Sequence, residues 1–353
     1  MILVTGGAGF IGANFVLDWL DGVDEAVINV DKLTYSGHLG TLRPLHGDPS
    51  HIFVRADICD RSTIDVLLAD YQPRAIVHFA AQNHVDYSID SPNDFVHTNI
   101  VGTYTLLEAA RCYWNGLQSD ERDAFRFLHV STDEVFGSLN LSDPPFSEDS
   151  HYQPDSPYCA TKASADHLVR AWGHTYGLPT LTTHCSNNYG PYQFPDKPIP
   201  QLITNALMGR ALPVHGDGQH VRDWLYVGDH CSAIRKILAK GRPGEAYNIG
   251  GWNEVKNIDL VHLVCDLLDQ YKPKRTGSYR DQITWLTERL GHDRRYATDA
   301  RKLERELGWK PAETFESGLA RTVRWYVEHE QWTHEVATGD FRDWVETTHQ
   351  KRA

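Results

Sequence analysis

Tyr158 and Lys162, in the segment "SPYCATK", are spaced for acid–base chemistry. Their separation of four residues puts both side chains on one face of a helix, one turn apart. A lysine cation beside a phenol stabilises the phenolate and lowers the tyrosine pKa, so the pair is a possible general base for an alcohol proton during hydride transfer. An isolated match of this spacing is more often a solvent-facing tyrosine and lysine, so the pair needs support from the rest of the chain.

An acidic pair, Asp133 and Glu134, stands where the apolar run "RFLHV" gives way to "STDEVFG", and Thr132 precedes Tyr158 by 26 residues. Adjacent side chains on a regular strand point to opposite faces of the sheet. Both carboxylates can reach one ligand only if the strand ends here, at the carboxyl edge where ligands of open α/β sheets bind. The ordinary alternative is a solvated strand end or a helix N-cap, since exposed carboxylates are the rule.

A glycine loop, "GGAGFIG", places Gly6, Gly9 and Gly12 between the strand-like "MILVT" and the amphipathic segment "FIGANFVLDWL". Glycines at this spacing permit a tight turn, close approach of the backbone to a pyrophosphate, and contact between helix and strand. An ordinary glycine-rich turn is the alternative. The position after the first strand of an alternating pattern favours a dinucleotide site.

Asp31 ends the second strand-like run, "AVINVD", 19 residues after Gly12. A carboxylate there accepts hydrogen bonds from the adenosine ribose hydroxyls and repels a 2′-phosphate, which favours NAD over NADP. Lys32 weakens this argument slightly, because a lysine could contact a phosphate. Asp57 follows the third run, where it could reach the adenine or serve as the N-cap of the helix over "STIDVLL".

These residues require a sheet to position them, and short β-branched runs alternate with helical stretches through the first half of the chain: "MILVT", "AVINVD", "IFVRAD", "AIVHFAA", "RFLHVST" and "LTTHCSN". The alternation predicts an α/β fold, a Rossmann-type doubly wound parallel sheet with a smaller mixed α/β C-terminal lobe. We assign residues 1–186 to the NAD-binding domain, with some later segments returning to it, and 187–353 mainly to the ligand-binding lobe.

Composition narrows the class of protein. With 47 acidic and 34 basic residues the net charge is −13, which argues against a nucleic-acid or anionic-membrane surface and means that an anionic ligand needs a local cationic pocket. The six cysteines have no paired spacing, and the 19 histidines form no HExxH or other ligand pattern, so we expect reduced thiols and no metal. No apolar run has transmembrane length and the start lacks a signal peptide, which predicts a cytoplasmic protein.

The chain resembles the extended short-chain dehydrogenase/reductase family, and within it the nucleotide-sugar 4,6-dehydratases. The resemblance runs essentially end to end, because the family's segments follow one another in order: "VTGGAGFIG", "HFAAQNHVDYSI", "STDEVFG", "SPYCATK", "SNNYGPYQFPDKPIP", "RDWLYVGDH", "YNIGG", "GHDRRYATD" and "ELGWKP". The glycine loop and the YxxxK spacing identify only the superfamily. Asp133 and Glu134 separate the dehydratases from related epimerases and decarboxylases.

The resemblance implies an intramolecular redox reaction on an NDP-glucose, and it favours dTDP-glucose as the substrate. Tyr158 takes the C4 hydroxyl proton while tightly bound NAD accepts the C4 hydride, and Thr132 holds the C4 oxygen. Glu134 removes the C5 proton, protonated Asp133 assists loss of the C6 hydroxyl, and the hydride returns to C6. Lys162 holds the nicotinamide ribose and tunes Tyr158.

The resemblance also implies the binding residues. The cofactor set is Gly6, Gly9, Phe10, Ile11, Gly12, Asp31, Lys32, Thr34, Asp57, Ile58, Ala80, Ala81, Thr98, Tyr158, Lys162 and Asn188. The substrate set is His84, Thr132, Asn187, Lys197, Pro200, Pro213, His215, Arg222, Asn257, Asp293, Arg294 and Tyr296, with Arg295 beside it. Taken without the family, each arginine is more often a surface ion-pair partner, and His84 is at least as often structural.

Four positions depart from the family: Tyr87 replaces arginine, Phe136 replaces tyrosine, and Gln82 and Asn83 replace glutamate and serine. None removes a proton carrier, so they put sugar preference and product release in doubt rather than the reaction type. Three alternatives stay open: an NDP-sugar 4-epimerase, a UDP-glucose 4,6-dehydratase, and a non-catalytic NAD-binding scaffold or sensor. The family resemblance implies a homodimer whose four-helix interface uses helices around residues 98–115 and 159–176.

Overall fold

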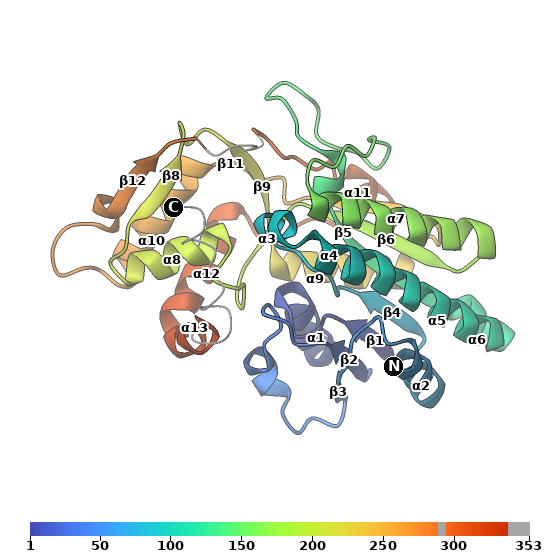
Figure 1. The fold of residues 1–353 in the computed structure, drawn as a ribbon. Helices are drawn as coiled ribbons and strands as arrows, with labels where there is room; N and C mark the ends of the chain where they lie inside the picture. Colours follow the sequence, from blue (N-terminus) through green and yellow to red (C-terminus); the bar gives the residue numbers. More distant parts are fainter. Residues whose placement is uncertain (289–293, 338–353) are drawn as a thin grey trace.

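The computed structural model describes residues 1–288 and 294–337, and a seven-stranded sheet forms its central layer (Figure 1). All of its strands are parallel, and they lie in the order β10-β6-β5-β4-β1-β2-β3. The order reverses between β1 and β4, which is where open α/β sheets leave a crevice for ligands. The strands are β1 (Ile2–Thr5), β2 (Val27–Asp31), β3 (His51–Arg55), β4 (Ala75–His78), β5 (Arg126–Thr132), β6 (Thr180–Cys185) and β10 (Ala246–Ile249).

Helices cover both faces of this sheet. Because alternate residues of a strand point to opposite faces, Ile2 and Val4 enter one hydrophobic core and Leu3 enters the other. The first core is closed by α1 (Phe10–Gly22), α9 (Val227–Lys240) and α11 (Arg301–Leu307), and the second by α2 (Arg61–Tyr71), α5 (Thr103–Gly116) and α7 (Pro157–Tyr176). The predicted doubly wound fold is confirmed.

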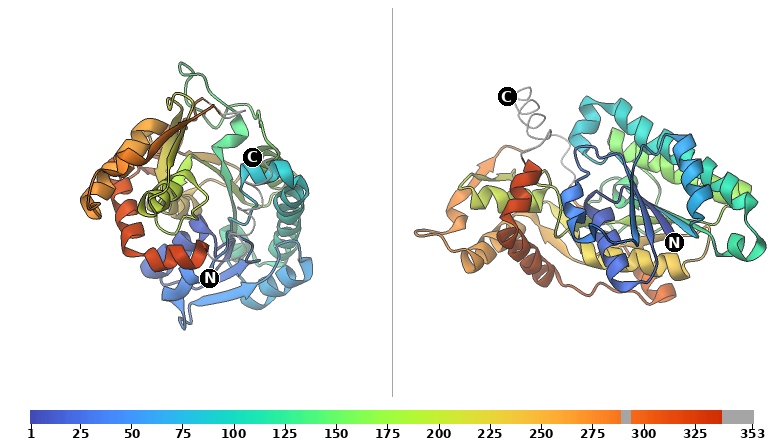
Figure 2. Two further views of the ribbon diagram at one scale, coloured as in Figure 1. Left: turned by 60° about the vertical axis from the view of Figure 1, so that its left-hand side comes forward. Right: turned by 90° about the horizontal axis from the view of Figure 1, so that it is seen from below.

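A smaller lobe follows β6 and has its own core (Figure 2). Two further sheets build it, one in the order β11-β9-β7 and one pairing β12 with β8. β10 and α9 come from the same half of the chain but belong to the large sheet and its cover. The lobe's elements are β7 (Asn187–Tyr189), α8 (Pro198–Leu207), β8 (Leu212–His215), β9 (Val221–Tyr226), β11 (Glu254–Lys256), α10 (Asn257–Tyr271), η4 (Tyr279–Gln282), β12 (Ile283–Leu286), α12 (Phe315–Glu328) and α13 (Glu330–Ala337).

Short helical segments connect the large elements. A seven-residue π-helix, η2 (Val96–Gly102), runs directly into α5, so the helix predicted around 98–115 is present with a wider first part. The other short segments are η1 (Leu39–Leu45), α3 (Val85–Asp90), α4 (Pro92–Phe95), α6 (Ser119–Ala124) and η3 (Asp133–Phe136). All six cysteines lie in the described ranges, and none of them forms a disulfide there. Within the described ranges, every helix is too short or too polar to cross a bilayer.

Candidate active site

One cavity opens at the carboxyl edge of the large sheet, where β1, β2, β4, β5 and β6 end. Every residue of the cofactor set implied by the family resemblance lines it, together with Thr132, Glu134, Asn187 and Lys197 from the catalytic and substrate sets. Sequence reasoning missed a further group of lining residues, which includes Ser36, Gly37, Cys185, Ser186 and Gln193. Ser36 and Gly37 lie in the loop after β2, several residues beyond the end of the strand. No sequence pattern indicated that this part of the loop would line the cavity.

The glycine loop has the shape that a pyrophosphate needs. Gly6 has φ +74°, and a Cβ there would lie 2.6 Å from the backbone nitrogen of Ala80, while a Cβ on Gly12 would lie 2.2 Å from the Gly6 carbonyl oxygen. A Cβ on Gly9 would meet nothing nearer than the Gly6 carbonyl oxygen at 3.4 Å, which is ordinary van der Waals contact. Gly9 begins α1 without a side-chain cap, and the first turn of α1 holds no acidic residue. The amide groups at this helix end therefore fit an anionic group.

Asp31 and Lys32 separate into two environments at the end of β2. The Asp31 carboxylate accepts hydrogen bonds from the backbone amides of Ala8 (2.9 Å) and Leu33 (2.7 Å), and burial raises its pKa. Lys32 forms an ion pair of 2.6 Å with Asp57. Asp57 is not the cap of α2, because that role falls to Asp60, whose side chain accepts from the Thr63 amide. The alternative assignment of Asp57 as an N-cap is wrong.

Tyr158 and Lys162 lie in the first turns of α7, which begins after the N-cap Ser156. Both side chains are buried, and the Lys162 Nζ donates to the Val130 carbonyl at 2.8 Å. Burial raises the pKa of the Tyr158 hydroxyl well above its ordinary value, and the Glu134 carboxylate raises it further. The prediction from the sequence that the Tyr158 pKa is lowered is therefore wrong for the protein without its cofactor. The cost of desolvating the phenolate outweighs the contacts that stabilise it.

The acidic pair stands where β5 ends, as its sequence required. Thr132 is the last residue of β5, and its hydroxyl accepts from the Glu134 amide at 3.3 Å as the chain turns into η3. This turn releases the two carboxylates from strand alternation, and Glu134 reaches the cavity. Its Oε2 lies 3.5 Å from the Cys159 thiol, which follows Tyr158 on α7.

Asp133 is buried beside the cavity rather than part of its lining. The side chain is 1% exposed, and its Oδ2 accepts a hydrogen bond of 2.9 Å from the Thr298 hydroxyl. Burial raises the pKa of Asp133 to about 8, and the carboxylates of Glu134 and Asp223 add to the shift. At neutral pH the Asp133 carboxyl is therefore mainly protonated, next to a second carboxyl on the following residue.

The structure brings part of the substrate set to the same edge. Asn187 and Lys197 line the cavity, and the Lys197 Nζ donates to the Asn83 carbonyl at 3.3 Å. His84 is the N-cap of α3, where its ring accepts from the Tyr87 amide and lies 3.5 Å from Asp196. Pro200 is buried in α8.

The other substrate residues that the structure describes lie in the second half of the chain and outside the cavity lining. Pro213 and His215 are on β8, and Asn257 opens α10. The guanidinium of Arg222, on β9, lies 4.8 Å from the centre of the Tyr296 ring. Asp293 lies outside the described residues.

The two neighbouring arginines already have acidic partners. Arg294 pairs with Asp217 at 3.0 Å, and Arg295 is buried and pairs with Glu254 at 2.6 Å. Asp217 also belongs to a cluster with His220 and Glu288, in which one possible metal-ligand atom from each residue lies within 4.8 Å of the others. Arg294 adds a positive charge beside this cluster. Arg295 differs from Arg294 in that it is buried and also donates to the Asp143 carbonyl at 2.6 Å.

The four departures from the family divide between the cavity and the core. Gln82 and Asn83 line the cavity, and the Gln82 amide donates to Asn99 at 2.8 Å. The Tyr87 hydroxyl donates to Asp94 at 3.2 Å, and Phe136 is 2% exposed and packs on Phe146. Only the first two positions therefore alter the cavity wall directly.

Comparison with known proteins identifies the family. A family model described as GDP-mannose 4,6 dehydratase matches residues 3–322. A dTDP-glucose 4,6-dehydratase of Xanthomonas campestris is 57% identical over 96% of this chain and 97% of its own length, and one of Escherichia coli is 53% identical over 99% of each. A crystal structure of a dTDP-glucose 4,6-dehydratase from Bacillus anthracis in complex with NAD has a TM-score of 0.84, with 44% identity over 95% of this chain and 99% of that one. The chain belongs to the dTDP-glucose 4,6-dehydratase branch of this dehydratase family.

Proposed function

We propose that the protein converts dTDP-glucose into dTDP-4-keto-6-deoxyglucose and water with tightly bound NAD. The observation that carries this proposal is the pair of unlike carboxyl groups at the end of β5. Glu134 lines the cavity, whereas Asp133 is buried with a pKa of about 8. An elimination of water needs a second base and an acid beside C5 and C6 of the sugar, whereas an epimerisation at C4 uses the Tyr158 and Lys162 pair and has no need of Asp133 and Glu134.

The first step is the oxidation of C4, in which Tyr158 takes the proton of the C4 hydroxyl. When bound, NAD supplies the hydride acceptor for C4, the hydride donor for C6, and a positive charge that favours the phenolate of Tyr158. Thr132, at the end of β5, donates a hydrogen bond to the C4 oxygen. Lys162 holds the nicotinamide ribose from the second turn of α7.

The second step is the elimination across C5 and C6. The 4-ketone acidifies the C5 proton, so that Glu134 can remove it, and Asp133 gives its proton to the departing C6 hydroxyl. Glu134 then returns a proton to C5. The positions of the two groups support these roles, because Glu134 lines the cavity and Asp133 is buried with a raised pKa.

The substrate's diphosphate must be accepted by a protein of net charge −13. We assign this task to Lys197, Arg222 and Arg294, with Asn187 at the sugar. The division into residues 1–186 for the cofactor and mainly 187–353 for the nucleotide sugar remains our proposal, as does NAD over NADP, which the engagement of Lys32 with Asp57 supports.

We also propose a homodimer in which η2, α5 and α7 of each copy form a four-helix interface. Large side chains are exposed on these helices, namely Val101 (41%), Tyr104 (47%) and Tyr176 (47%), and the rings of both tyrosines pack against Trp172. We further propose a location in the reducing cytoplasm, with which the lack of a disulfide among the six described cysteines agrees.

Mass spectrometry of the product formed in deuterated water tests the function. The purified protein is incubated with dTDP-glucose or UDP-glucose, without added NAD. We expect a product that has lost one water and holds one deuterium at C5, formed faster from dTDP-glucose. A sugar of unchanged formula with inverted C4 would establish an epimerase instead, and no turnover with either nucleotide, even with added NAD, would contradict the proposal.

A further inference from the structure

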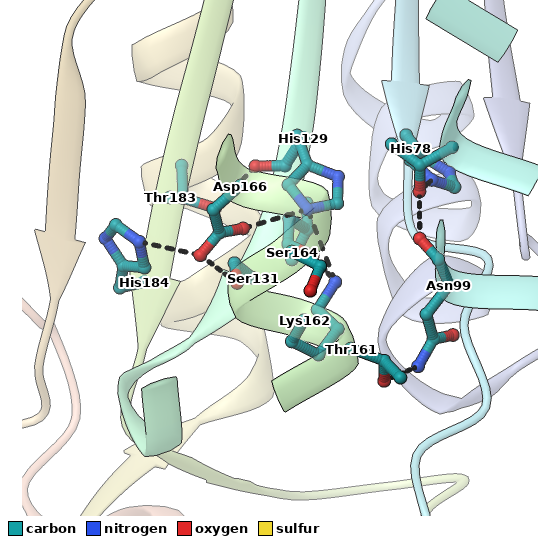
Figure 3. A network of polar contacts seen from close by, with 12 residues as sticks. His78, Asn99, His129, Ser131, Thr161, Lys162, Ser164, Asp166, Thr183 and His184 are labelled. Carbon is teal, nitrogen blue, oxygen red and sulfur yellow. Dashed lines mark hydrogen bonds and ion pairs between the residues drawn. The ribbon is translucent and has the colours of Figure 1, made fainter. Parts of the chain in front are cut away.

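A buried carboxylate, Asp166, lies one helical turn after Lys162 on α7, within a network of polar side chains (Figure 3). Its side chain is 3% exposed, and it does not line the cavity. Four polar groups surround it: the Ser131 hydroxyl at 2.9 Å, the Tyr152 hydroxyl at 3.2 Å, and the Nε2 atoms of His129 at 3.1 Å and His184 at 3.3 Å. The proposed mechanism uses none of these contacts.

This environment keeps Asp166 ionised. Burial by itself raises the pKa of the carboxyl, but the hydrogen bonds from His129 and His184 outweigh it and hold the pKa well below its usual range. His129 is uncharged at neutral pH, because burial and the nearby Lys162 lower its pKa to about 4. At neutral pH Asp166 is therefore an anion and His129 is neutral.

Lys162 needs such an anion. Its Nζ is buried, and its polar contacts are the Val130 carbonyl at 2.8 Å and the His129 Nε2 at 3.5 Å, neither of which is charged. Burial lowers the pKa of Lys162, and Asp166 raises it. The other titratable groups facing this cluster are His78 on β4, His184 and Cys185 on β6, and Tyr158 on α7. His129 stands between the lysine and Asp166 and contacts both.

We propose that Asp166 is the buried counter-ion of Lys162 and a positioning residue for the oxidation step, acting through the charge of Lys162. It keeps the lysine cationic, and so able to hold the cofactor and favour the Tyr158 phenolate. The kinetic part of this inference rests on the proposed function. The electrostatic part does not, since two buried charges of opposite sign depend on each other whatever the reaction is.

A double-mutant cycle on thermal unfolding tests the pairing without using activity. Holoenzymes carrying Asp166→Asn, Lys162→Met and both changes are melted at one protein and one NAD concentration. In the wild-type background we expect Asp166→Asn to lower the Tm by about 5–10 °C. In the Lys162→Met background the same change should lower the Tm by less than half as much, because the double variant has no unpaired buried charge. Equal losses in the two backgrounds would overturn the proposal.

Tyr152→Phe is the matched control, since it removes one hydroxyl from the same carboxylate and keeps the charge. With dTDP-glucose, we expect Asp166→Asn to slow formation of the reduced cofactor at least about tenfold with KM little changed, and Tyr152→Phe to slow it less than about threefold. Similar slowing in both variants would overturn the role in oxidation. Wild-type enzyme that fails to oxidise dTDP-glucose would instead reject the proposed function, while the unfolding cycle still decides the pairing.

Discussion

The carboxyl edge of the large sheet and the smaller lobe hold their functional residues in different ways. At the edge, strand ends and one helix turn bring Thr132, Glu134 and Tyr158 into a single cavity. On the lobe, Arg222 lies over the Tyr296 ring and Arg294 pairs with a carboxylate 77 residues earlier in the chain. The residues that we assign to the chemistry are therefore positioned by short segments of regular structure, and those that we assign to the nucleotide sugar are positioned by contacts between distant segments.

The largest expected effect is at the edge. Asp133→Asn keeps the shape of the side chain but removes its acidic proton, so we expect dehydration to slow about 10²–10³-fold while C4 oxidation continues. Rapid-quench analysis of the sugar and absorbance of the reduced cofactor separate the two steps. Thr298→Val is the graded control, since it removes only the hydroxyl that donates to Asp133. Loss of oxidation in Asp133→Asn would break the assignment of an acid that acts in the second step.

The pH dependence of Asp133 sharpens the same point. Because its pKa is raised to about 8, dehydration should decline as the pH rises through this value, and Asp133→Asn should lack this decline. The free energy of unfolding should fall over the same pH range. Between pH 3.8 and about pH 8 the Asp133 carboxyl is ionised in the unfolded chain and protonated in the folded chain. Wild type should therefore lose stability relative to Asp133→Asn as the pH rises. Chemical denaturation at pH 4 and pH 8 measures this. If the difference in unfolding free energy between wild type and Asp133→Asn were the same at both pH values, the Asp133 carboxyl would not be buried in its neutral form.

On the lobe we expect an effect on binding rather than on chemistry. Arg222→Gln removes a cation assigned to the diphosphate and should raise KM about 10–100-fold with kcat little changed. Arg301→Gln is the control, because Arg301 forms a surface ion pair with Asp299 and should leave both constants unchanged. Steady-state kinetics with dTDP-glucose decide. A fall in kcat alone would remove the distinction between the two regions.

The smallest expected effect concerns the support of the edge. Gly12→Ala forces a Cβ against the Gly6 carbonyl, so we expect a loss of about 1–3 kcal/mol in unfolding free energy and less bound NAD. Gly9→Ala meets nothing nearer than 3.4 Å and should cost less than about 0.5 kcal/mol in the NAD-free protein. Denaturant unfolding and the NAD content of the purified protein measure both. Equal losses would show that α1 is not packed closely on β1.

The same contrast explains what could be predicted from the sequence. Strand ends and helix spacing are local, so the fold and the termination of the strand at Thr132 were predicted from short segments. Burial is not local: the raised pKa of Tyr158 and the ion pair of Arg295 depend on what the folded chain places around them. The hydroxyl that donates to Asp133 comes from Thr298, 165 residues away, and no spacing pattern predicts it.

The most direct test of two separate carboxyl roles is a single turnover of Glu134→Gln with dTDP-glucose, followed by absorbance of the reduced cofactor and by mass spectrometry of the sugar. If Glu134 is the base of the elimination, the reduced cofactor forms at a rate near that of wild type and persists, while dehydration slows at least about 100-fold. Dehydration at the wild-type rate would contradict the assignment and with it the division of labour at the end of β5.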